Sequence, residues 1–460
     1  MVWATLCTVA SRVTGARAAA WALHQQVWGE GAYANLAWPR IASDAKLSAE
    51  DRRFATELAY GSLRRYGQWG RLITLASGRA EKALEPGIWW VLVLGAHQLF
   101  AMSTAVHAAV NETVALSKAV GYARASGLVN AVMRRLSEKT LDQWLEALTD
   151  GVTDPLDVLA LRHAHPRWIV DALAHSLERE GRSGELDALL DSHNSPARPQ
   201  LVLLEGAPEP SDEATPLSPR GVYATGDPGA DARVAAGTAR VQDEGSQLAA
   251  LIAARVGGLG PRSRVLDACA GPGGKAAVLA SALQAVGGKL VAIEQHPHRA
   301  ELVRNSVRAF STLVDVVTAD VNEYLVDHRP WDLIVLDAPC SGLGALRRRP
   351  EARWTKSPED LPGLTHTQRT LLASAADALA PGGHLVYVTC SPVVEETTDA
   401  VSWLCESNGN IEAVDTAAVL AEITAGEPPG VRVGQAVQLW PHRHGTDAMF
   451  IQILRAKTRD

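Results

Sequence analysis

The hydrophobic and polar positions of the chain follow two different periods. Over about the first 140 residues, apolar side chains return every three or four positions, as expected for amphipathic helices. Ser48 and Asp51 supply a start signal resembling a capping box. Short turns separate the runs, which predicts an all-α bundle, and helical spacing continues to about residue 184. The predicted helices of the bundle cover 17–28, 48–63, 86–98, 111–120 and 125–136.

From about Val241, short apolar runs alternate with helical runs. Strands that are apolar on both faces and alternate with helices predict an α/β fold, in which helices cover both faces of a mostly parallel sheet. Residues 436–440 and 448–454 predict an antiparallel hairpin that completes the sheet. The predicted strands cover 264–268, 289–294, 315–318, 332–337 and 384–390, and the helices 275–285, 297–310 and 365–380.

Between these halves, residues 193–237 are rich in Pro, Gly, Ser and acidic residues, with a brief strand signal at 201–204. This composition favours a small connecting domain with irregular loops. A chain of 460 residues is expected to hold two or three domains. We therefore predict an all-α domain over 1–145, a connecting domain over 146–240 and an α/β domain over 241–460.

Composition narrows the possible classes of protein. The chain is 47% hydrophobic and 21% charged, which excludes a disordered protein, and its net charge of -7 argues against a broadly basic nucleic-acid binder. Residues 1–150 carry 16 Lys+Arg against 12 Asp+Glu, so any RNA contact is expected to be local. The chain shows no secretory leader and no apolar run of roughly 20 residues, which predicts a cytoplasmic protein that makes no membrane contact.

The five cysteines form no Cys-x-x-Cys pair, and we expect no metal site, including at His442, His444 and Asp447. A reducing compartment leaves thiols free to act as nucleophiles. We expect Cys7, Cys269 and Cys405 to be inert buried residues.

A glycine-rich turn follows the first predicted strand, in Asp267-Ala268-Cys269-Ala270-Gly271-Pro272-Gly273-Gly274-Lys275. In an open α/β sheet, ligands bind beyond the carboxyl ends of the strands. The phosphate-binding patterns of dinucleotide and nucleotide sites are absent, so the turn suits a ligand with a carboxylate and a sulfonium. Glu294 and Asp320 end the next two strands and are expected to contact ribose hydroxyls and an adenine, with Arg299 nearby.

Two further cysteines end strands at the same predicted edge. Cys340 lies in Asp337-Ala338-Pro339-Cys340-Ser341-Gly342 and Cys390 in Thr389-Cys390-Ser391. A thiolate beside an S-adenosylmethionine loop is the chemistry needed to methylate carbon 5 of a pyrimidine, and Asp337 can act at the pyrimidine edge. An amino-group methyltransferase is disfavoured because no Asn/Asp-Pro-Pro-Tyr follows the fourth strand. Spacing alone does not rank the two thiols.

The segment after Cys340 is strongly basic. We expect it to grip an RNA backbone through arginines and to stack an unpaired base on a tryptophan. The residues expected to do so are Arg347, Arg348, Arg349, Arg353 and Trp354.

These motifs resemble those of the bacterial small-subunit rRNA cytosine-C5 methyltransferases of the Fmu/Sun type, relatives of the Nol/Nop/Sun proteins. The signature is Asp-x-Cys-Ala-x-Pro-Gly-Gly-Lys, Asp-Ala-Pro-Cys-Ser-Gly and Thr-Cys-Ser. Residues 241–247 look like the entry to the family's catalytic domain. Residues 108–114 and 127–135 look like its NusB-like helical domain, and Asp447-Ala448-Met449-Phe450 departs from the usual Asp-Gly-Phe.

The resemblance implies a Rossmann-like, S-adenosylmethionine-dependent methyltransferase domain preceded by a NusB-like domain. It implies that Cys390 is the nucleophile, that Cys340 assists product release and that Asp337 serves both the cytosine N3 edge and the cofactor. The substrate would be an unpaired cytosine of small-subunit rRNA, and the protein a monomer. A tRNA or DNA cytosine methyltransferase and a non-catalytic RNA-binding assembly or antitermination factor remain alternatives. The cofactor residues implied are Cys269, Ala270, Gly271, Pro272, Gly273, Gly274, Lys275, Glu294, Arg299, Asp320 and Asp337.

Overall fold

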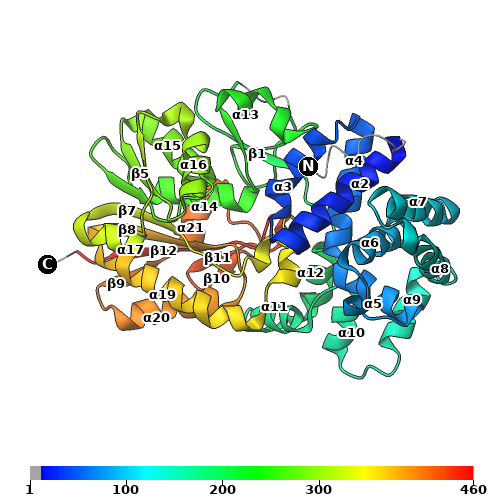
Figure 1. Cartoon of the computed structure of the whole chain (residues 1–460). Helices are drawn as coiled ribbons and strands as arrows, with labels where there is room; N and C mark the ends of the chain where they lie inside the picture. Colours follow the sequence, from blue (N-terminus) through cyan, green and yellow to red (C-terminus); the bar gives the residue numbers. More distant parts are fainter. Residues whose placement is uncertain (1–11, 209, 211, 459–460) are drawn as a thin grey trace. The chain divides into compact units, whose positions relative to one another are not determined.

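The computed structural model describes residues 12–208, 210 and 212–458 (Figure 1). The chain forms two compact units, each built from several segments. The helical unit comprises Met1–Ala174, Gly184–Pro196 and Leu346–Ser357. The sheet unit comprises His175–Ser183, Ala197–Ala345 and Pro358–Asp460. No helix among the described residues is long and apolar enough to cross a membrane.

The helical unit is the predicted all-α bundle. Its central helix, α6 (Pro86–Phe100), is buried on almost every side from Gly87 to Gln98, and it packs against α2, α4, α5, α7 and α8. A helix that is apolar all round belongs in the middle of such a bundle. Ser48 caps α4, as predicted, by accepting from Asp51 N. The surrounding helices are α2 (Arg12–His24), α3 (Ala34–Asp44), α4 (Ala49–Arg64), α5 (Tyr66–Ser77), α7 (Val106–Ala119), α8 (Ser126–Leu136), α9 (Leu141–Thr149), α10 (Pro155–Arg162) and α12 (Leu186–Ser192).

The predicted connecting domain over 146–240 does not form a compact unit of its own. Its first helices belong to the helical unit, and the boundary falls within α11 (Arg167–Arg179). The remainder forms a three-stranded antiparallel sheet of β2 (Gly221–Tyr223), β1 (Gln200–Leu203) and β3 (Ala239–Val241), which belongs to the sheet unit. Irregular composition indicated loops here but could not indicate which core each part joins.

The sheet unit contains the predicted mixed sheet, with strand order β10-β11-β12-β8-β7-β4-β5-β6 and β9 paired to β12. The pairs from β8 through β7 and β4 to β5 and β6 are parallel. The hairpin predicted at the end appears as β11 and β12, while β9 was not predicted. The strands are β4 (Arg264–Asp267), β5 (Lys289–Ile293), β6 (Val314–Val317), β7 (Trp331–Asp337), β8 (Leu379–Thr389), β9 (Ile411–Val414), β10 (Arg432–Val433), β11 (Ala436–Gln438) and β12 (Phe450–Ala456).

Two apolar cores cover the two faces of this sheet. Alternate residues along each strand face opposite cores, as for Val335 and Leu336 of β7. Figure 1 shows α15 and α16 on one face and α19 and α20 on the other. The helices are α14 (Glu244–Val256), α15 (Gly274–Val286), α16 (Pro297–Ser306) and α21 (Thr416–Ile423) on the first face, and α17 (Val321–Asp327), α19 (Leu361–Asp377) and α20 (Thr398–Ser407) on the second.

Candidate active site

The glycine-rich turn joins β4 to α15, and two of its glycines lie so close to neighbouring residues that no side chain would fit at either position. A Cβ on Gly271 would lie 2.1 Å from Glu294 Oε2. Gly273 has a φ of 103°, which favours glycine, and a Cβ added there would collide with the Ser306 Cβ at 2.6 Å. Helix α15 begins with no side-chain cap. The first backbone N–H groups of the helix can therefore serve a ligand's carboxylate, as the sequence predicts.

Glu294, Arg299 and Gly271, all predicted to contact the cofactor, meet at the end of β5. Glu294 is buried, accepts from His296 N at 2.9 Å and lies 3.5 Å from Arg299 Nε. Arg299 also donates to the carbonyl of Gly271 at 2.8 Å. Asp320 follows β6, the strand next to β5, and caps α17 by accepting from Asn322 N at 2.8 Å. The carboxylates thus follow two adjacent strands at one edge of the sheet.

Lys275 and Asp337 form a partly buried ion pair beside the turn, with Nζ 2.7 Å from Oδ2. Burial alone would lower the pKa of Lys275, but the charge of Asp337 and the hydrogen bond to it outweigh burial and raise the pKa. The charge of Cys390 contributes in the same direction. Lys275 therefore stays an ammonium within electrostatic reach of the Cys390 thiol.

Asp267, at the end of β4, is 1% exposed, and neither carboxylate oxygen has a well-formed hydrogen bond. Burial, with a smaller effect of the Asp337 charge, raises the pKa of Asp267 to about 7. A buried carboxyl group without donors is costly unless a ligand satisfies it. The acidic groups around this turn therefore fit a ligand that carries positive charge, such as the ammonium and sulfonium of S-adenosylmethionine.

The two predicted reactive thiols lie side by side. Cys390 directly follows β8 and Cys340 follows the adjacent parallel strand β7, and their sulfur atoms are 3.4 Å apart. The hydrogen bond to Cys390 and burial raise the pKa of Cys340 well above its usual range. The two loops are also joined through Gly344, whose N–H donates to the carbonyl of Cys390 at 2.9 Å. Neither sulfur is held in a disulfide, as covalent chemistry by a thiolate requires.

The departure from Asp-Gly-Phe lies next to these loops. Ala448 N donates to the Gly344 carbonyl at 3.0 Å, and Asp447 N donates to Asp243 Oδ1 at 3.1 Å. Asp243 also caps α14 by accepting from Gly245 N. Asp243 of the 241–247 motif therefore joins the start of α14 to the segment that precedes β12.

The structure describes two of the three cysteines that were expected to be inert, and both are half-buried. Cys269 and Cys405 pack against the apolar core that covers one face of the sheet. Burial raises the pKa of both thiols. Cys7 lies outside the described residues.

The basic segment after Cys340 belongs to the helical unit, and it does not form the patch that we predicted. Arg353 is fully buried and donates to backbone carbonyls of Arg64, Ala164 and His193 and to Asn194 Oδ1. These bonds engage the guanidinium inside the protein, so the prediction that Arg353 grips phosphate is wrong. Basic residues often mark a nucleic-acid surface, but Arg353 serves instead to cross-link the helical unit.

Trp354 is likewise part of the helical core. Its indole N–H donates to the Leu63 carbonyl at 2.9 Å, and its ring lies so close to Gly67 that a Cβ there would be 2.3 Å away. Arg347, Arg348 and Arg349 are half-buried, and the Arg349 guanidinium lies 4.7 Å from the centre of the Tyr33 ring. These three arginines keep some exposed surface, as does Trp354, but the Trp354 ring and its N–H are engaged within the helical unit.

One buried residue that joins the two cysteine loops was not predicted. Glu396 is fully buried and accepts hydrogen bonds from Ser341 and Ser391, the residues that directly follow the two cysteines. The sequence contains Glu395-Glu396 in an ordinary polar stretch. No local pattern indicates that the second of these glutamates is buried beneath two loops.

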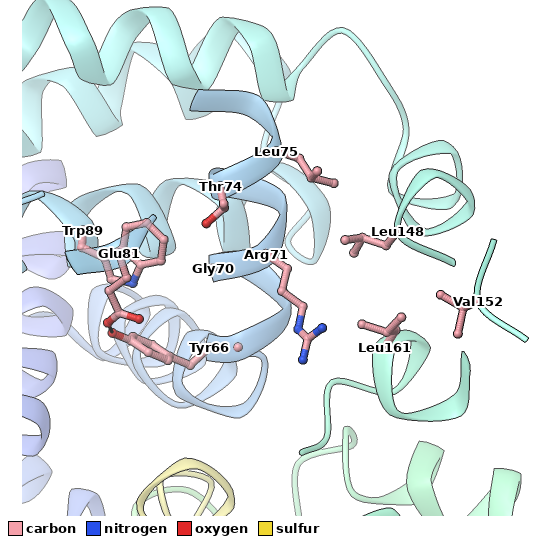
Figure 2. Close-up of a pocket in the computed structure, with 11 residues that line it drawn as sticks. Tyr66, Gly70, Arg71, Thr74, Leu75, Glu81, Trp89, Leu148, Val152 and Leu161 are labelled. Carbon is pink, nitrogen blue, oxygen red and sulfur yellow. Dashed lines mark hydrogen bonds between the residues drawn. The ribbon is translucent and has the colours of Figure 1, made fainter. Parts of the chain in front are cut away.

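A separate hollow of about 510 Å³ lies in the helical unit (Figure 2). Tyr66, Arg71 and Thr74 line it from α5, Trp89 from α6, and Leu148 and Leu161 from α9 and α10. It contains none of the residues to which the sequence assigned chemistry.

Comparison with known proteins finds a matching family for each half of the chain. The family description "16S rRNA methyltransferase RsmB/F" matches residues 259–455, and the NusB family matches residues 14–138. The chain is 39% identical, over 96% of its length and 97% of the relative, to Rv1407 of Mycobacterium tuberculosis, whose name assigns it provisionally to the methyltransferases. It is 31% identical to ribosomal RNA small subunit methyltransferase B of Pseudomonas putida, over 88% of this chain and 90% of the relative.

Solved structures show the same fold at low identity. The crystal structure of PH0851 superposes with a TM-score of 0.79 at 19% identity, covering 97% of this chain and 99% of that one. NSun6 from Pyrococcus horikoshii, solved with SFG, has a TM-score of 0.52 at 18% identity, covering 64% of this chain and 99% of that one. The sheet unit is thus a Rossmann-like methyltransferase domain, and the α-helical region before it is NusB-like. The chain belongs to the RsmB/F family of 16S rRNA methyltransferases.

Proposed function

We propose that this protein uses S-adenosylmethionine to methylate carbon 5 of an unpaired cytosine in small-subunit rRNA. The observation that carries the proposal is the pair of sulfur atoms 3.4 Å apart, on loops after adjacent parallel strands, beside the Lys275–Asp337 ion pair. C5 of cytosine is a poor nucleophile, so its methylation requires a covalent activation that a thiolate supplies. The Pseudomonas putida relative is named as a methyltransferase of small-subunit rRNA, which supports this choice of substrate.

The residues around the β4–α15 turn are proposed to hold the methyl donor. Gly271 and Gly273 leave room for it, and the start of α15 offers N–H groups to its carboxylate. Glu294 is proposed to accept from ribose hydroxyls and Asp320 from the adenine amino group, while Asp267 and Asp337 favour its positive charge. When bound, S-adenosylmethionine supplies an electrophilic methyl group. Other proposed contacts come from Cys269, Ala270, Pro272, Gly274, Lys275 and Arg299.

Cys390 is proposed to attack the cytosine. Its thiolate forms a bond to C6, and the C5–C6 π electrons shift through C4 to N3. N3 takes a proton from solvent, and the Asp337 carboxylate accepts a hydrogen bond from the new N3–H group. C5 would then take the methyl group that the donor supplies, and the donor would keep the electron pair of its broken sulfur–methyl bond. A base then takes the C5 proton and N3 returns its proton to solvent, so that the C5–C6 double bond re-forms and the sulfur–C6 bond breaks with its electrons returning to Cys390. The Lys275 ammonium lies within electrostatic reach of Cys390, and an ammonium near a thiol favours the thiolate.

Cys340 is proposed to assist the release step. Its pKa is raised well above the usual range, chiefly by the hydrogen bond to Cys390 and by burial, so it is a thiol at neutral pH. A neutral thiol 3.4 Å from the attacking sulfur can donate a hydrogen bond to the departing Cys390 thiolate and so stabilise its charge.

The RNA is proposed to present the cytosine outside any duplex, because C6 is unreachable within a base stack. Arg347, Arg348 and Arg349 retain partial exposure and are proposed to contact the RNA backbone. Arg353 and Trp354 are not included, since both are engaged within the helical unit.

The experiment offers the purified protein and S-adenosylmethionine to three RNAs: naked small-subunit rRNA, assembled small subunits and tRNA. Bisulfite sequencing then locates any 5-methylcytosine. The proposal expects a modified cytosine in small-subunit rRNA, in one or both of its forms. Modification of tRNA alone would support the tRNA alternative. Failure to bind S-adenosylmethionine in calorimetry would instead support a non-catalytic RNA-binding factor.

A further inference from the structure

Glu396 lies in the short 3-10 helix η9 (Val394–Glu396) and accepts four hydrogen bonds from the residues that frame the two thiols. Its Oε2 accepts from Ser341 Oγ at 2.6 Å and from Ser391 Oγ at 2.5 Å. Its Oε1 accepts from Ser341 N at 2.7 Å and from Gln368 Nε2 at 3.1 Å. Ser341 and Ser391 directly follow Cys340 and Cys390 in the chain. One carboxylate therefore joins both cysteine loops.

The contacts are concentrated on the Cys340 loop. Gln368, on α19, donates both to Glu396 and to the carbonyl of Pro339, at 2.9 Å. Pro339 and Ser341 flank Cys340, so both neighbours of this cysteine are tied to the same carboxylate or to its partner. The two serine hydroxyls are 3.1 Å apart, next to sulfur atoms that are 3.4 Å apart. The spacing of the serines thus reproduces the spacing of the thiols.

Glu396 itself is firmly held. Its side chain is 0% exposed, and its backbone carbonyl accepts from the Tyr387 hydroxyl at 2.8 Å, which fixes it to β8. A buried carboxylate is tolerated only when hydrogen bonds replace its hydration. Here all the donors to the carboxylate come from the cysteine loops or from the glutamine that holds one of them, which indicates a role beyond filling the core.

We propose that Glu396 is a positioning residue that holds Cys340 and Cys390 at the separation used in the reaction. The inference rests on the proposed function for the roles of the two thiols. Glu396 also places a negative charge next to the Cys340 loop. This charge is one of those that raise the pKa of Cys340, after the hydrogen bond to Cys390 and burial. The titratable groups that face Cys340 are Cys390, Glu396, Asp337 and Tyr387.

The test compares Glu396→Gln with Glu395→Gln, a matched change at the adjacent exposed residue. Alkylation of Cys340 by iodoacetamide is followed across pH by peptide mass spectrometry, without RNA or methyl donor. In Glu396→Gln, the midpoint of Cys340 alkylation is expected to fall by about one pH unit, since a nearby negative charge is lost. Glu395→Gln is expected to match the unchanged protein. Equal midpoints in all three proteins would overturn the inference.

A second readout is the kinetics of RNA methylation. Glu396→Gln is expected to lower kcat by ~10-fold or more, while KM for the RNA stays within about twofold, because the thiols act in the chemical steps and not in RNA binding. If Glu396→Gln does not fold, Ser341→Ala removes one donor and keeps the charge, and the same split between kcat and KM is expected. A rise in KM with kcat unchanged would contradict the positioning role.

The two readouts separate the failure of this inference from failure of the proposed function. A shifted alkylation profile in a protein that methylates no cytosine would uphold the role of Glu396 in holding the thiols and refute the proposed function. An unshifted alkylation profile, in a protein that does methylate cytosine in rRNA, would refute the role of Glu396 and uphold the proposed function.

Discussion

Replacement of Arg353 by alanine is expected to destabilise the helical unit by about 4 kcal/mol. The guanidinium donates four hydrogen bonds at 2.9–3.1 Å, three of them to backbone carbonyls. These acceptors come from residues near 64, 164 and 193, so one side chain joins segments far apart in the chain. Each bond contributes about 1 kcal/mol, and truncation leaves buried acceptors without a donor. Arg353→Lys is expected to rescue little, because one ammonium cannot reach the same set of acceptors.

The assay is urea unfolding followed by tryptophan fluorescence, which reports mainly on the helical unit because most of the 13 tryptophans lie in its segments. With a urea m-value of about 2 kcal/mol/M, the midpoint of the transition should fall by roughly 2 M. Arg349→Ala is the matched control, since it removes a half-buried guanidinium from the same segment. The change costs its contact with the Tyr33 ring, worth about 0.5–1 kcal/mol, and its charge near Glu351. A midpoint shift for Arg353→Ala no larger than that of the control would refute the reasoning.

Two further predictions concern the methyl-donor site. Asp267 has a pKa raised to about 7, and the ammonium group of a bound ligand favours its ionised form. Calorimetry should therefore show S-adenosylhomocysteine, which keeps this ammonium, binding about tenfold more weakly at pH 6 than at pH 8, with a plateau above pH 8. Asp267→Asn should flatten this dependence, and an unchanged slope would refute the assignment. Gly271→Ala places a Cβ 2.1 Å from Glu294 Oε2 and should weaken S-adenosylhomocysteine binding by more than about tenfold, whereas Gly363→Ala, with nothing within 4 Å, should bind normally. Equal binding by both glycine variants would show that the turn does not approach the ligand.

The sequence was most informative where local periodicity and position along the strands determine the structure. Alternating strands and helices predicted the parallel part of the sheet, and cysteines at the ends of neighbouring strands predicted that Cys340 and Cys390 would meet. The glycine turn was recognisable from its run of glycines after a predicted strand. The structure gives the reason for two of them, since a side chain at Gly271 or Gly273 would collide with its neighbours. These features depend on residues close in sequence or on a simple rule for sheet edges.

The errors involve contacts between residues far apart in the chain. Arg353 follows three other arginines in a basic run, but its acceptors lie more than 150 residues away, and no local pattern predicts that it is buried. Glu396 was overlooked for the same reason, since its partners include Ser341 and Gln368 on other elements. Strand β9 pairs antiparallel with β12 at the end of the chain, which a short polar-apolar run did not indicate. Charge and burial of a single residue follow from the tertiary fold, which local sequence patterns do not determine.

The central claim is that Cys390 forms a covalent bond to the cytosine and that Cys340 assists its release. It is tested most directly by incubating wild-type protein, Cys390→Ala and Cys340→Ala with S-adenosylmethionine and small-subunit rRNA, followed by denaturing electrophoresis. We expect Cys340→Ala to accumulate a protein–RNA adduct that survives denaturation and Cys390→Ala to form neither adduct nor 5-methylcytosine. An adduct formed by Cys390→Ala but not by Cys340→Ala would contradict the account and reverse the roles of the two thiols.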